Sequence, residues 1–351
     1  MPEQAARRRE LAARLIPVVA GATLVLPVPV AAAAPAGPAA PSVRCQVTDP
    51  RLPELSGLVA VGEEYLAIND GGDQVAVHVL DGACRVTAVH TAPVDPYDPE
   101  DLAVGADGTV WLADTGDNGL DRATVALIAL RPDGSTGLYR LAYPDGPRDV
   151  EALLLAPDGT PYLVTKEVLG ASAVYRPVSA LVDSGTVGLT EVGGVSFTLT
   201  GTPGGPVGRA GQLMVTGGAV SRDGRTVALR TYTDAYVWPL SGSDVAGALA
   251  GEPVRIPLPE ALQGEAVTFT PDGSALVVAG EGLPGDLTVV PVAAVPSTSP
   301  SGADGGVQQL LGSDEAGPSL LPAAVVAAAV AAVLVWLGGR LRRRGGPPTT
   351  G

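Results

Sequence analysis

Three glutamates stand at equivalent places in a repeated sequence phrase, and their side chains are suited to binding a cation. Glu100, Glu151 and Glu265 each open an apolar segment that is followed by an Asp-Gly turn and a second apolar segment. Ser56 and Thr216 open two further copies of the phrase. Carboxylate and hydroxyl oxygens are the ligands that a hard cation such as calcium prefers. These five residues, called the openers below, predict a ring of oxygen ligands if the copies surround one axis.

Each copy of the phrase also ends at an equivalent residue, called the closing residue. The closing residues are Asp70, Asp114, Thr165, Arg230 and Ala279. In an antiparallel hairpin, the first residue of one strand lies beside the last residue of its partner. We therefore expect each opener beside its closing residue, Glu100 beside Asp114 for example, at one mouth of the fold. The expected ligand-binding residues are Glu100, Glu151, Glu265, Asp70, Asp114, Asp117, Lys166 and Arg230. The expected metal ligands are Glu100, Asp114, Asn118, Glu151 and Glu265.

Converging carboxylates repel one another unless positive charge compensates them. Bound calcium is one form of compensation. The other is internal, because Lys166, which is the only lysine, and Arg230 are expected at the same mouth and would pair with the glutamates. In a catalytic site, Lys166 or Arg230 would stabilise developing negative charge. No Ser–His–Asp set can be assembled, because the only histidines, His78 and His90, lie on strands of a single copy.

The elements that must position these residues are strands. Each copy is a hairpin, and apolar segments for a third and a fourth strand follow in most copies, residues 195–199 being the fourth in the third copy. Four-stranded repeats of this length are typical of propeller blades. We predict an all-β propeller of about five four-stranded blades over residues 41–292, with six blades as the alternative. The interval from Glu151 to Thr216 is the longest and leaves room for an insertion.

The last copy lacks an outer strand, and residues 44–47 are expected to supply it and close the ring. Cys45 lies in this segment and Cys84 lies in a turn of the first copy; they are the only cysteines. In an exported chain, two cysteines most simply form one disulfide, with free thiols as the alternative. The bond would lock the closure and stabilise the fold by about 3–4 kcal/mol.

The two ends of the chain differ from the propeller in composition. Residues 1–40 contain arginines, an apolar run and a stretch of alanines, in the order of a signal peptide with a short leader. Residues 293–318, rich in Pro, Ser and Gly, predict a stalk. Residues 319–338 carry no charge and predict one transmembrane helix, with a buried core helix as the alternative, and residues 339–351 are a basic tail. We therefore expect a bacterial single-pass membrane protein with a monomeric ectodomain outside the cell and a cytoplasmic C-terminus.

The charge of the chain indicates the kind of partner that its ectodomain can attract. The formal net charge is −15, and residues 41–318 hold 35 of the 37 acidic residues but only 14 of the 22 basic ones. Nucleic acids and anionic lipids are attracted by clusters of Lys and Arg, so neither is expected to bind the ectodomain. A metal ion or a cationic partner fits this charge better, and a purely solubilising role is the alternative.

Several segments of the repeats resemble a known group of propellers. They are PEDL at 99–102, GTVWLADTGDN at 108–118, VEAL at 150–153, VTKE at 164–167 and GEAV at 264–267. These segments resemble exported bacterial propellers of the phytase-like ("esterase-like activity of phytase") group, and the wider NHL and gluconolactonase-like propellers. In gluconolactonase-like members, the resemblance implies a divalent ion whose ligands would be Glu100, Asp114 and Asn118 here. Phytase-like members hold phosphate with calcium and several basic residues, whereas this mouth offers only Lys166 and Arg230.

Two functions are consistent with these features. In the preferred interpretation, the chain is a membrane-anchored, extracytoplasmic binding module whose acidic mouth binds an extracellular ligand or protein. In the alternative, it is a calcium-dependent hydrolase of phosphoesters, esters or lactones, in which Glu100, Glu151 and Glu265 hold the metal.

Overall fold

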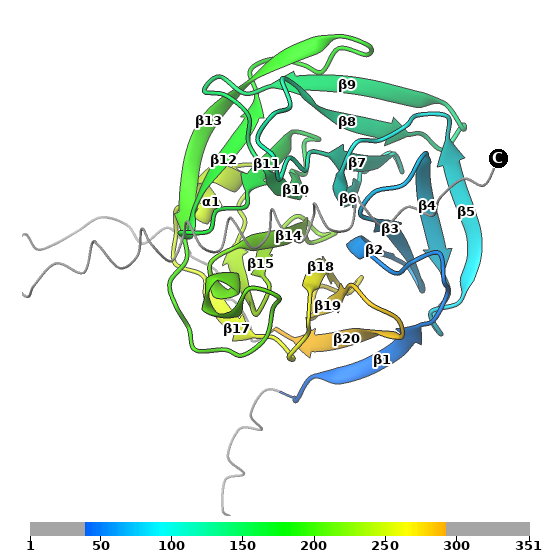
Figure 1. Ribbon diagram of the computed structural model, residues 1–351, viewed down its shortest axis with the longest axis vertical. Helices are drawn as coiled ribbons and strands as arrows, with labels where there is room; N and C mark the ends of the chain where they lie inside the picture. The colour runs from blue at the N-terminus through cyan, green and yellow to red at the C-terminus, as the bar shows by residue number, and fades with distance from the viewer. Residues whose placement is uncertain (1–38, 293–351) are drawn as a thin grey trace, which may run out of the picture. The chain divides into compact units, whose positions relative to one another are not determined.

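The computed structural model describes residues 39–292, which form almost only β-strands. Figure 1 shows the sheets arranged around a central axis, with the first strand of each meander innermost. Successive strands pair in antiparallel meanders because each apolar segment is separated from the next by a turn. The arrangement is that of a β-propeller.

The strands fall into four-stranded meanders in chain order. The first contains β2 (Leu55–Val61), β3 (Glu64–Asn69), β4 (Val75–Leu80) and β5 (Val86–Ala92). The second contains β6 (Pro99–Val104), β7 (Val110–Asp114), β8 (Val125–Leu130) and β9 (Thr136–Ala142). The third contains β10 (Val150–Leu155), β11 (Pro161–Thr165), β12 (Ala171–Pro177) and β13 (Thr186–Ser196). The second and third form one eight-stranded sheet, because β9 and β13 pair in parallel.

The remaining strands form two further sheets. One contains β14 (Val215–Val220), β15 (Thr226–Thr231), β16 (Asp234–Pro239) and β17 (Val254–Pro257). The other contains β18 (Gly264–Phe269), β19 (Ala275–Gly280) and β20 (Gly285–Pro291), with β1 (Ser42–Val47) as its fourth strand. The helices of residues 39–292 are short, the 3-10 helix η1 (Gly208–Gln212) and α1 (Val245–Leu249).

Hydrophobic clusters fill the space between neighbouring meanders. Ala113 of the second meander shares a cluster with Leu163 of the third, and Val164 shares another with Leu229 of the fourth. A further cluster joins the last sheet to the first meander and contains Leu58. The innermost strands also contact one another in the cyclic order β2, β6, β10, β14, β18 and β2 again. The apolar faces of the strands thus close the ring around the axis.

The N-terminal strand completes the last sheet, as predicted. β1 pairs antiparallel with β20, with Cys45 opposite Leu287 and Val47 opposite Gly285. Because β20 is the third strand of its meander, β1 takes the outer position that the last copy of the repeat does not fill. The first and last parts of the domain are therefore joined in one sheet.

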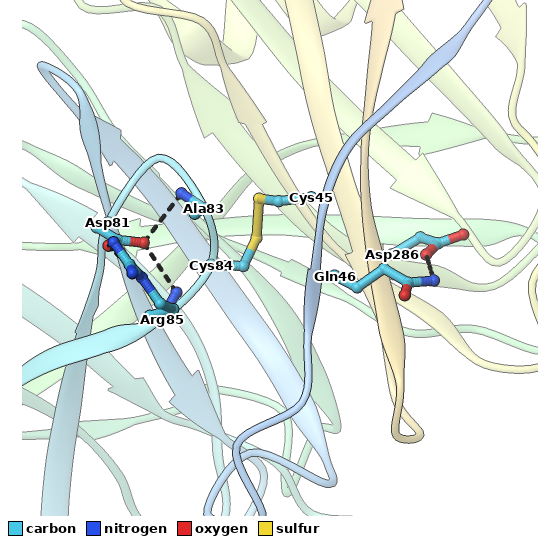
Figure 2. Close-up of a disulfide and its surroundings, with 7 residues drawn as sticks. All are labelled: Cys45, Gln46, Asp81, Ala83, Cys84, Arg85 and Asp286. Atoms are coloured by element: carbon cyan, nitrogen blue, oxygen red, sulfur yellow. Dashed lines mark hydrogen bonds and ion pairs between the residues drawn. A yellow bond between two sulfur atoms is a disulfide. The ribbon is translucent and has the colours of Figure 1, made fainter.

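The predicted disulfide is confirmed and fastens this closure. Cys45 on β1 is bonded to Cys84 in the turn between β4 and β5, 39 residues away (Figure 2). The carboxylate of Asp81 holds that turn by accepting hydrogen bonds from the backbone N–H groups of Ala83 and Arg85. On the other side of β1, the side chain of Gln46 donates to Asp286 at 2.8 Å. The bond thus ties the last sheet to the first meander.

One strand lies away from its predicted place. The fourth strand of the third meander was expected at residues 195–199, whereas β13 runs from Thr186 to Ser196. Val187 and Leu189 are both buried in the core. Leu189 pairs with Pro177 of β12, and Val187 pairs with Leu141 of β9, so the strand begins earlier than predicted. The long interval between Glu151 and Thr216 holds an insertion at residues 197–214, which contains η1.

Within residues 39–292, no helix has both the length and the apolar character needed to cross a membrane. The predicted signal peptide, stalk, transmembrane segment 319–338 and basic tail lie outside the described residues.

Candidate cation-binding site

The openers lie at β-bulges near the start of the innermost strands. The register between first and second strand shifts at each of them, Ser56, Glu100, Glu151, Thr216 and Glu265. A bulge leaves one residue without a partner opposite and re-aims its side chain. The predicted pairing is therefore wrong by one residue, because Pro99 rather than Glu100 lies opposite Asp114.

The bulges bring three openers together. Carboxylate oxygens of Glu100, Glu151 and Glu265 lie within 4.8 Å of one another, and these residues are only 3%, 1% and 3% exposed. Calcium binds oxygen at about 2.4 Å, so ligands on opposite sides of one ion are about 5 Å apart. Glu100 also belongs to a second group of the same size, with Asp70 and Asp98. This acidic cluster fits the coordination distances of a hard cation.

The protein supplies too little positive charge to neutralise the acidic cluster. Burial, Glu151 and Asp70 raise the pKa of Glu100 well above its usual value. Burial also raises the pKa of Glu265. Burial and the neighbouring Asp70 together raise the pKa of Asp98 to about 8. Without a cation, these carboxyl groups retain protons at pH values where ordinary carboxyl groups are ionised.

Lys166 supplies the positive charge nearest to the glutamates. Its Nζ donates a hydrogen bond of 2.5 Å to Oε1 of Glu151, and it lies 5.6 Å from the centre of the Tyr232 ring. Burial opposes the charge of this lysine, but Glu151, Tyr232 and Asp149 outweigh burial and hold its pKa well above the usual value. Lys166 is therefore a charged, ion-paired member of the cluster, as the internal form of compensation predicts.

This lysine does not satisfy the glutamate that it pairs with. Oε2 of Glu151 is buried and has no hydrogen-bond partner among the described residues. A buried carboxylate oxygen without a partner is costly, whereas a bound cation would satisfy it. This oxygen belongs to a residue of the three-glutamate group, so it is a candidate ligand for a cation.

Arg230 points its guanidinium at backbone oxygens. It is 1% exposed, and its Nη1 donates to the carbonyls of Ala266 and Ala279 at 2.7 and 2.9 Å. Burial lowers its pKa to about 10. Gly264 makes room for this side chain, because a Cβ there would lie 2.2 Å from Nη2. Arg230 thus joins the fourth meander to the last sheet, a different task from the ligand contact expected of it.

The hydroxyl-bearing openers also join strands. Ser56 donates to the carbonyl of Glu100 at 2.5 Å, and Thr216 donates to the carbonyl of Gly264 at 3.0 Å. Each hydrogen bond connects one innermost strand to the innermost strand of a neighbouring meander. These two residues complete the ring of openers as structural links.

Two other predicted ligands, Asp114 and Asp117, accept hydrogen bonds from groups of the neighbouring loops. Asp114 accepts hydrogen bonds from the backbone of Asp98 and from Arg122, and the second of these is an ion pair of 3.1 Å. Asp117 holds its own loop by accepting from the backbone N–H of Arg122. Asn118 is exposed. Among the described residues, Asp114 is not part of either group of converging carboxylates.

Sequence reasoning missed two carboxylates of the mouth, Asp98 and Asp149. Asp98 joins Asp70 and Glu100, while Asp149 accepts from the backbone N–H of Asp117 at 2.8 Å and interacts with Lys166. A signal for them was present, because each lies two residues before an opener glutamate. The residues in that place, in chain order, are Glu54, Asp98, Asp149, Met214 and Gln263.

Asp101 is a third residue that sequence reasoning passed over. It is 1% exposed, and its Oδ2 accepts from the backbone N–H groups of Leu153 on β10 and Gly218 on β14, while Oδ1 accepts from Leu102. One carboxylate thus links three innermost strands, directly beside Glu100. Burial raises its pKa to about 8, although the three backbone donors favour ionisation.

This geometry can hold a small cation more readily than it can hold an organic molecule. The three glutamates are almost fully buried, their oxygens converge, and their positions are fixed by bulges and by Asp101. Nearer the loops, Asp98 is half-buried and carries a carboxyl group that titrates near neutral pH.

Comparison with known proteins finds likeness only among solved structures. No protein-family model matches the chain, and no curated protein matches it. A gluconolactonase from Xanthomonas campestris is similar at 21% identity and a TM-score of 0.41, over 68% of this chain and 71% of that one. A virginiamycin B lyase from Staphylococcus aureus has 10% identity and a TM-score of 0.37, over 68% of each chain. Hydrazine synthase from Kuenenia stuttgartiensis has 14% identity and a TM-score of 0.38, over 71% of this chain and 98% of that one.

Gluconolactonase-like propellers, which the sequence segments resemble, are thus among the similar structures, and the likeness to the phytase-like group stays a prediction. At these identities and scores, the similarities carry no argument about activity. The fold rests on the strand order, and the function must be argued from the site.

Proposed function

We propose that this chain is an extracytoplasmic binding module whose propeller holds a divalent cation, calcium being the best fit, between Glu100, Glu151 and Glu265. The observation that carries the proposal is the buried, unpartnered Oε2 of Glu151 inside a group of three converging carboxylates. Lys166 compensates one carboxylate, whereas Glu100 and Glu265 form no ion pair within residues 39–292. Oxygen-only ligands favour calcium or magnesium over zinc, and the loose geometry of buried glutamates suits calcium better than magnesium.

The test is calorimetric titration of calcium into the full chain, purified in detergent because of its apolar segment 319–338. Wild-type protein should bind calcium, and Glu100→Gln should weaken binding by at least about tenfold, because it removes one charge from the ligand set. Glu252→Gln, an exposed change outside the cluster, is the matched control and should leave the affinity unchanged. If millimolar calcium gives neither heat nor a shift in melting temperature, the proposal is wrong.

A second function, metal-dependent hydrolysis, is favoured by one specific observation. A carboxylate oxygen of Asp98 lies within 4.8 Å of carboxylate oxygens of Asp70 and Glu100, and Asp98 is half-buried rather than fully buried. A carboxyl group held beside a metal site can serve as a general acid or base. Such a group next to a bound cation is the minimum that hydrolysis of a phosphoester, ester or lactone requires.

This second function is tested with aryl phosphate, aryl acetate and lactone substrates, each with calcium and with chelator. Calcium-dependent turnover that Asp98→Asn abolishes, while calcium binding persists, would establish hydrolysis. Absence of turnover on all three classes would leave the binding module as the function.

The same proposal includes the architecture and location. A five-bladed propeller is supported by the meanders β2–β5, β6–β9, β10–β13 and β14–β17, together with the sheet closed by β1. Export is supported by the Cys45–Cys84 disulfide, since such bonds persist in oxidising compartments. We place the ectodomain outside a bacterial cell as a monomer, held by a single span at 319–338 with a cytoplasmic tail.

A further inference from the structure

Large exposed apolar side chains are concentrated at one end of the propeller. Residues 39–292 expose nine of them, and single exposed residues of this kind are ordinary on protein surfaces. Their distribution is not ordinary. Six lie in loops that precede a first strand or join a second strand to a third, namely Tyr97, Leu120, Leu169, Leu199, Leu262 and Leu283.

These loops all belong to the end of the propeller at which the openers lie. First strands begin at the openers, and antiparallel second strands end beside that point, so both kinds of loop share one face. We call it the mouth face. Within the described part of the chain, the opposite end has only two such residues, Val178 and Val182, both in the loop between β12 and β13. The ninth, Val43, lies on β1.

The apolar residues of the mouth face are held in fixed positions. Leu120 has a φ of +51°, which is unfavourable for leucine, and Asp117 fixes its turn by accepting from the backbone N–H groups of Asp121 and Arg122. Arg122 lies 4.6 Å from the centre of the Tyr97 ring. Backbone strain and preorganised side chains occur preferentially where a surface has a binding role.

Further loops of the mouth face are fixed in the same way. Leu169 lies in a turn closed by a hydrogen bond from Gly170 N–H to the carbonyl of Glu167. Leu262 follows Ala261, whose carbonyl accepts from Gly205 in the insertion at 197–214. Leu169 and Leu262 are 66% and 88% exposed despite this support.

The mouth face also exposes carboxylates that form no ion pair with any residue of the segment 39–292. They are Asp73, Asp95, Asp121 and Glu260, and none of them takes part in an ion pair of the described residues. The basic side chains of these loops, apart from Arg209, are already paired: Arg51 with Asp49, Arg122 with Asp114, Arg148 with Asp145 and Lys166 with Glu151. A partner that docks here must therefore bring its own positive charge.

We propose that the mouth face is a docking surface for a protein segment that combines apolar side chains with lysine or arginine. The leucines supply apolar contacts around the mouth, and the exposed carboxylates attract and orient the basic groups. A lipid surface is disfavoured, because the anionic lipids that recruit most peripheral proteins would be repelled. The surface does not depend on the buried glutamates, so it stands or falls separately from the cation site.

The probe is a fluorescent peptide of alternating leucine and lysine, titrated into the full chain and followed by anisotropy. A peptide that alternates leucine with glutamate tests whether binding requires positive charge. A peptide that alternates glycine with lysine tests whether binding requires apolar side chains. The rim variant is Leu169→Ser with Leu262→Ser, and its matched control is Val178→Ser with Val182→Ser, which removes two exposed apolar residues from the opposite end. The charge variant is Asp73→Asn with Asp121→Asn, with Glu63→Gln and Glu252→Gln as its control.

Only the leucine–lysine peptide should bind, and the rim and charge variants should each weaken it by at least about tenfold, while both controls stay within about twofold. Calcium titration of the rim variant should match wild type, which separates this result from the cation site and shows that the variant is folded. Equal losses in the rim variant and its control would overturn the proposal. So would absence of peptide binding, or equal binding to phosphatidylcholine vesicles in place of the peptide.

Discussion

Nζ of Lys166 lies 2.5 Å from Oε1 of Glu151, while Oε2 of the same glutamate is buried without a partner. One oxygen of this carboxylate is therefore bonded to the protein, whereas the other has no hydrogen-bond partner among the described residues. Internal compensation and a bound cation were alternatives in the sequence, but in the structure the lysine contacts only one oxygen of Glu151, so the two forms of compensation are compatible. The lysine neutralises part of the cluster, and the remainder is what an ion would complete.

Lys166→Met should destabilise the fold strongly when no cation is present. The change leaves Glu151 buried without its counterion, and breaking a buried pair costs about 3–5 kcal/mol. Urea unfolding in chelator measures this loss. Calcium should recover a larger share of stability in the variant than in wild type, because an ion can take over the missing charge. A variant as stable as wild type in chelator would show that Glu151 does not need the lysine.

The stability of the cation-free protein should fall as pH rises from about 4 to about 8. Burial and neighbouring carboxylates raise the pKa values of Glu100 and Glu265, and raise that of Asp98 to about 8. A raised carboxyl pKa favours the protonated folded state, so its contribution is complete below the unfolded pKa near 4 and is lost as pH passes the folded value. Melting temperatures in chelator across this range check the sign.

Calcium gives the matched control for this pH dependence. A divalent ion stabilises the ionised carboxylates, so the decline between pH 5 and pH 8 should become smaller in calcium, and affinity for calcium should rise over the same range. A decline of equal size with and without calcium would mean that the titrating groups do not touch the ion.

The repeat allowed the fold to be predicted, but the detail of the site depended on bulges. Period, turn residues and apolar segments determine hairpins, and the missing outer strand pointed to β1. The predicted pairing of Glu100 with Asp114 was wrong by one residue, because a β-bulge adds an extra residue to the first strand. The amino-acid composition of the strand does not indicate this bulge. Asp114, an expected metal ligand, forms an ion pair with Arg122, a contact set by how the loop at 115–124 folds back. Spacing places residues at one end of a hairpin, whereas loop conformation decides which way they point.

Asp101 should be among the most sensitive positions in the domain. Asp101→Ala leaves three buried backbone N–H groups without an acceptor, and each costs about 1–3 kcal/mol. Asp101→Asn keeps an oxygen that can serve Leu153 and Gly218, so it should cost clearly less. Urea unfolding ranks the two variants, and calcium titration of the asparagine variant tests whether the linked strands also set the position of Glu100. Alanine and asparagine variants of equal stability would mean that these hydrogen bonds contribute little.

Removing the disulfide should weaken the pairing of β1 with the last sheet before it unfolds the other sheets of the propeller. Cys45→Ala with Cys84→Ala opens a loop of 39 residues and should cost about 3–4 kcal/mol. Hydrogen exchange should accelerate first in β1 and β20, because β1 is then held by its pairing with β20, by the packing of Val47 and by contacts such as that of Gln46 with Asp286. Gln46→Ala, which removes that exposed hydrogen bond but keeps the disulfide, is the control and should cost about 1 kcal/mol or less. Uniform acceleration across all sheets would contradict a local closure, since the bond would then stabilise the ring as a whole.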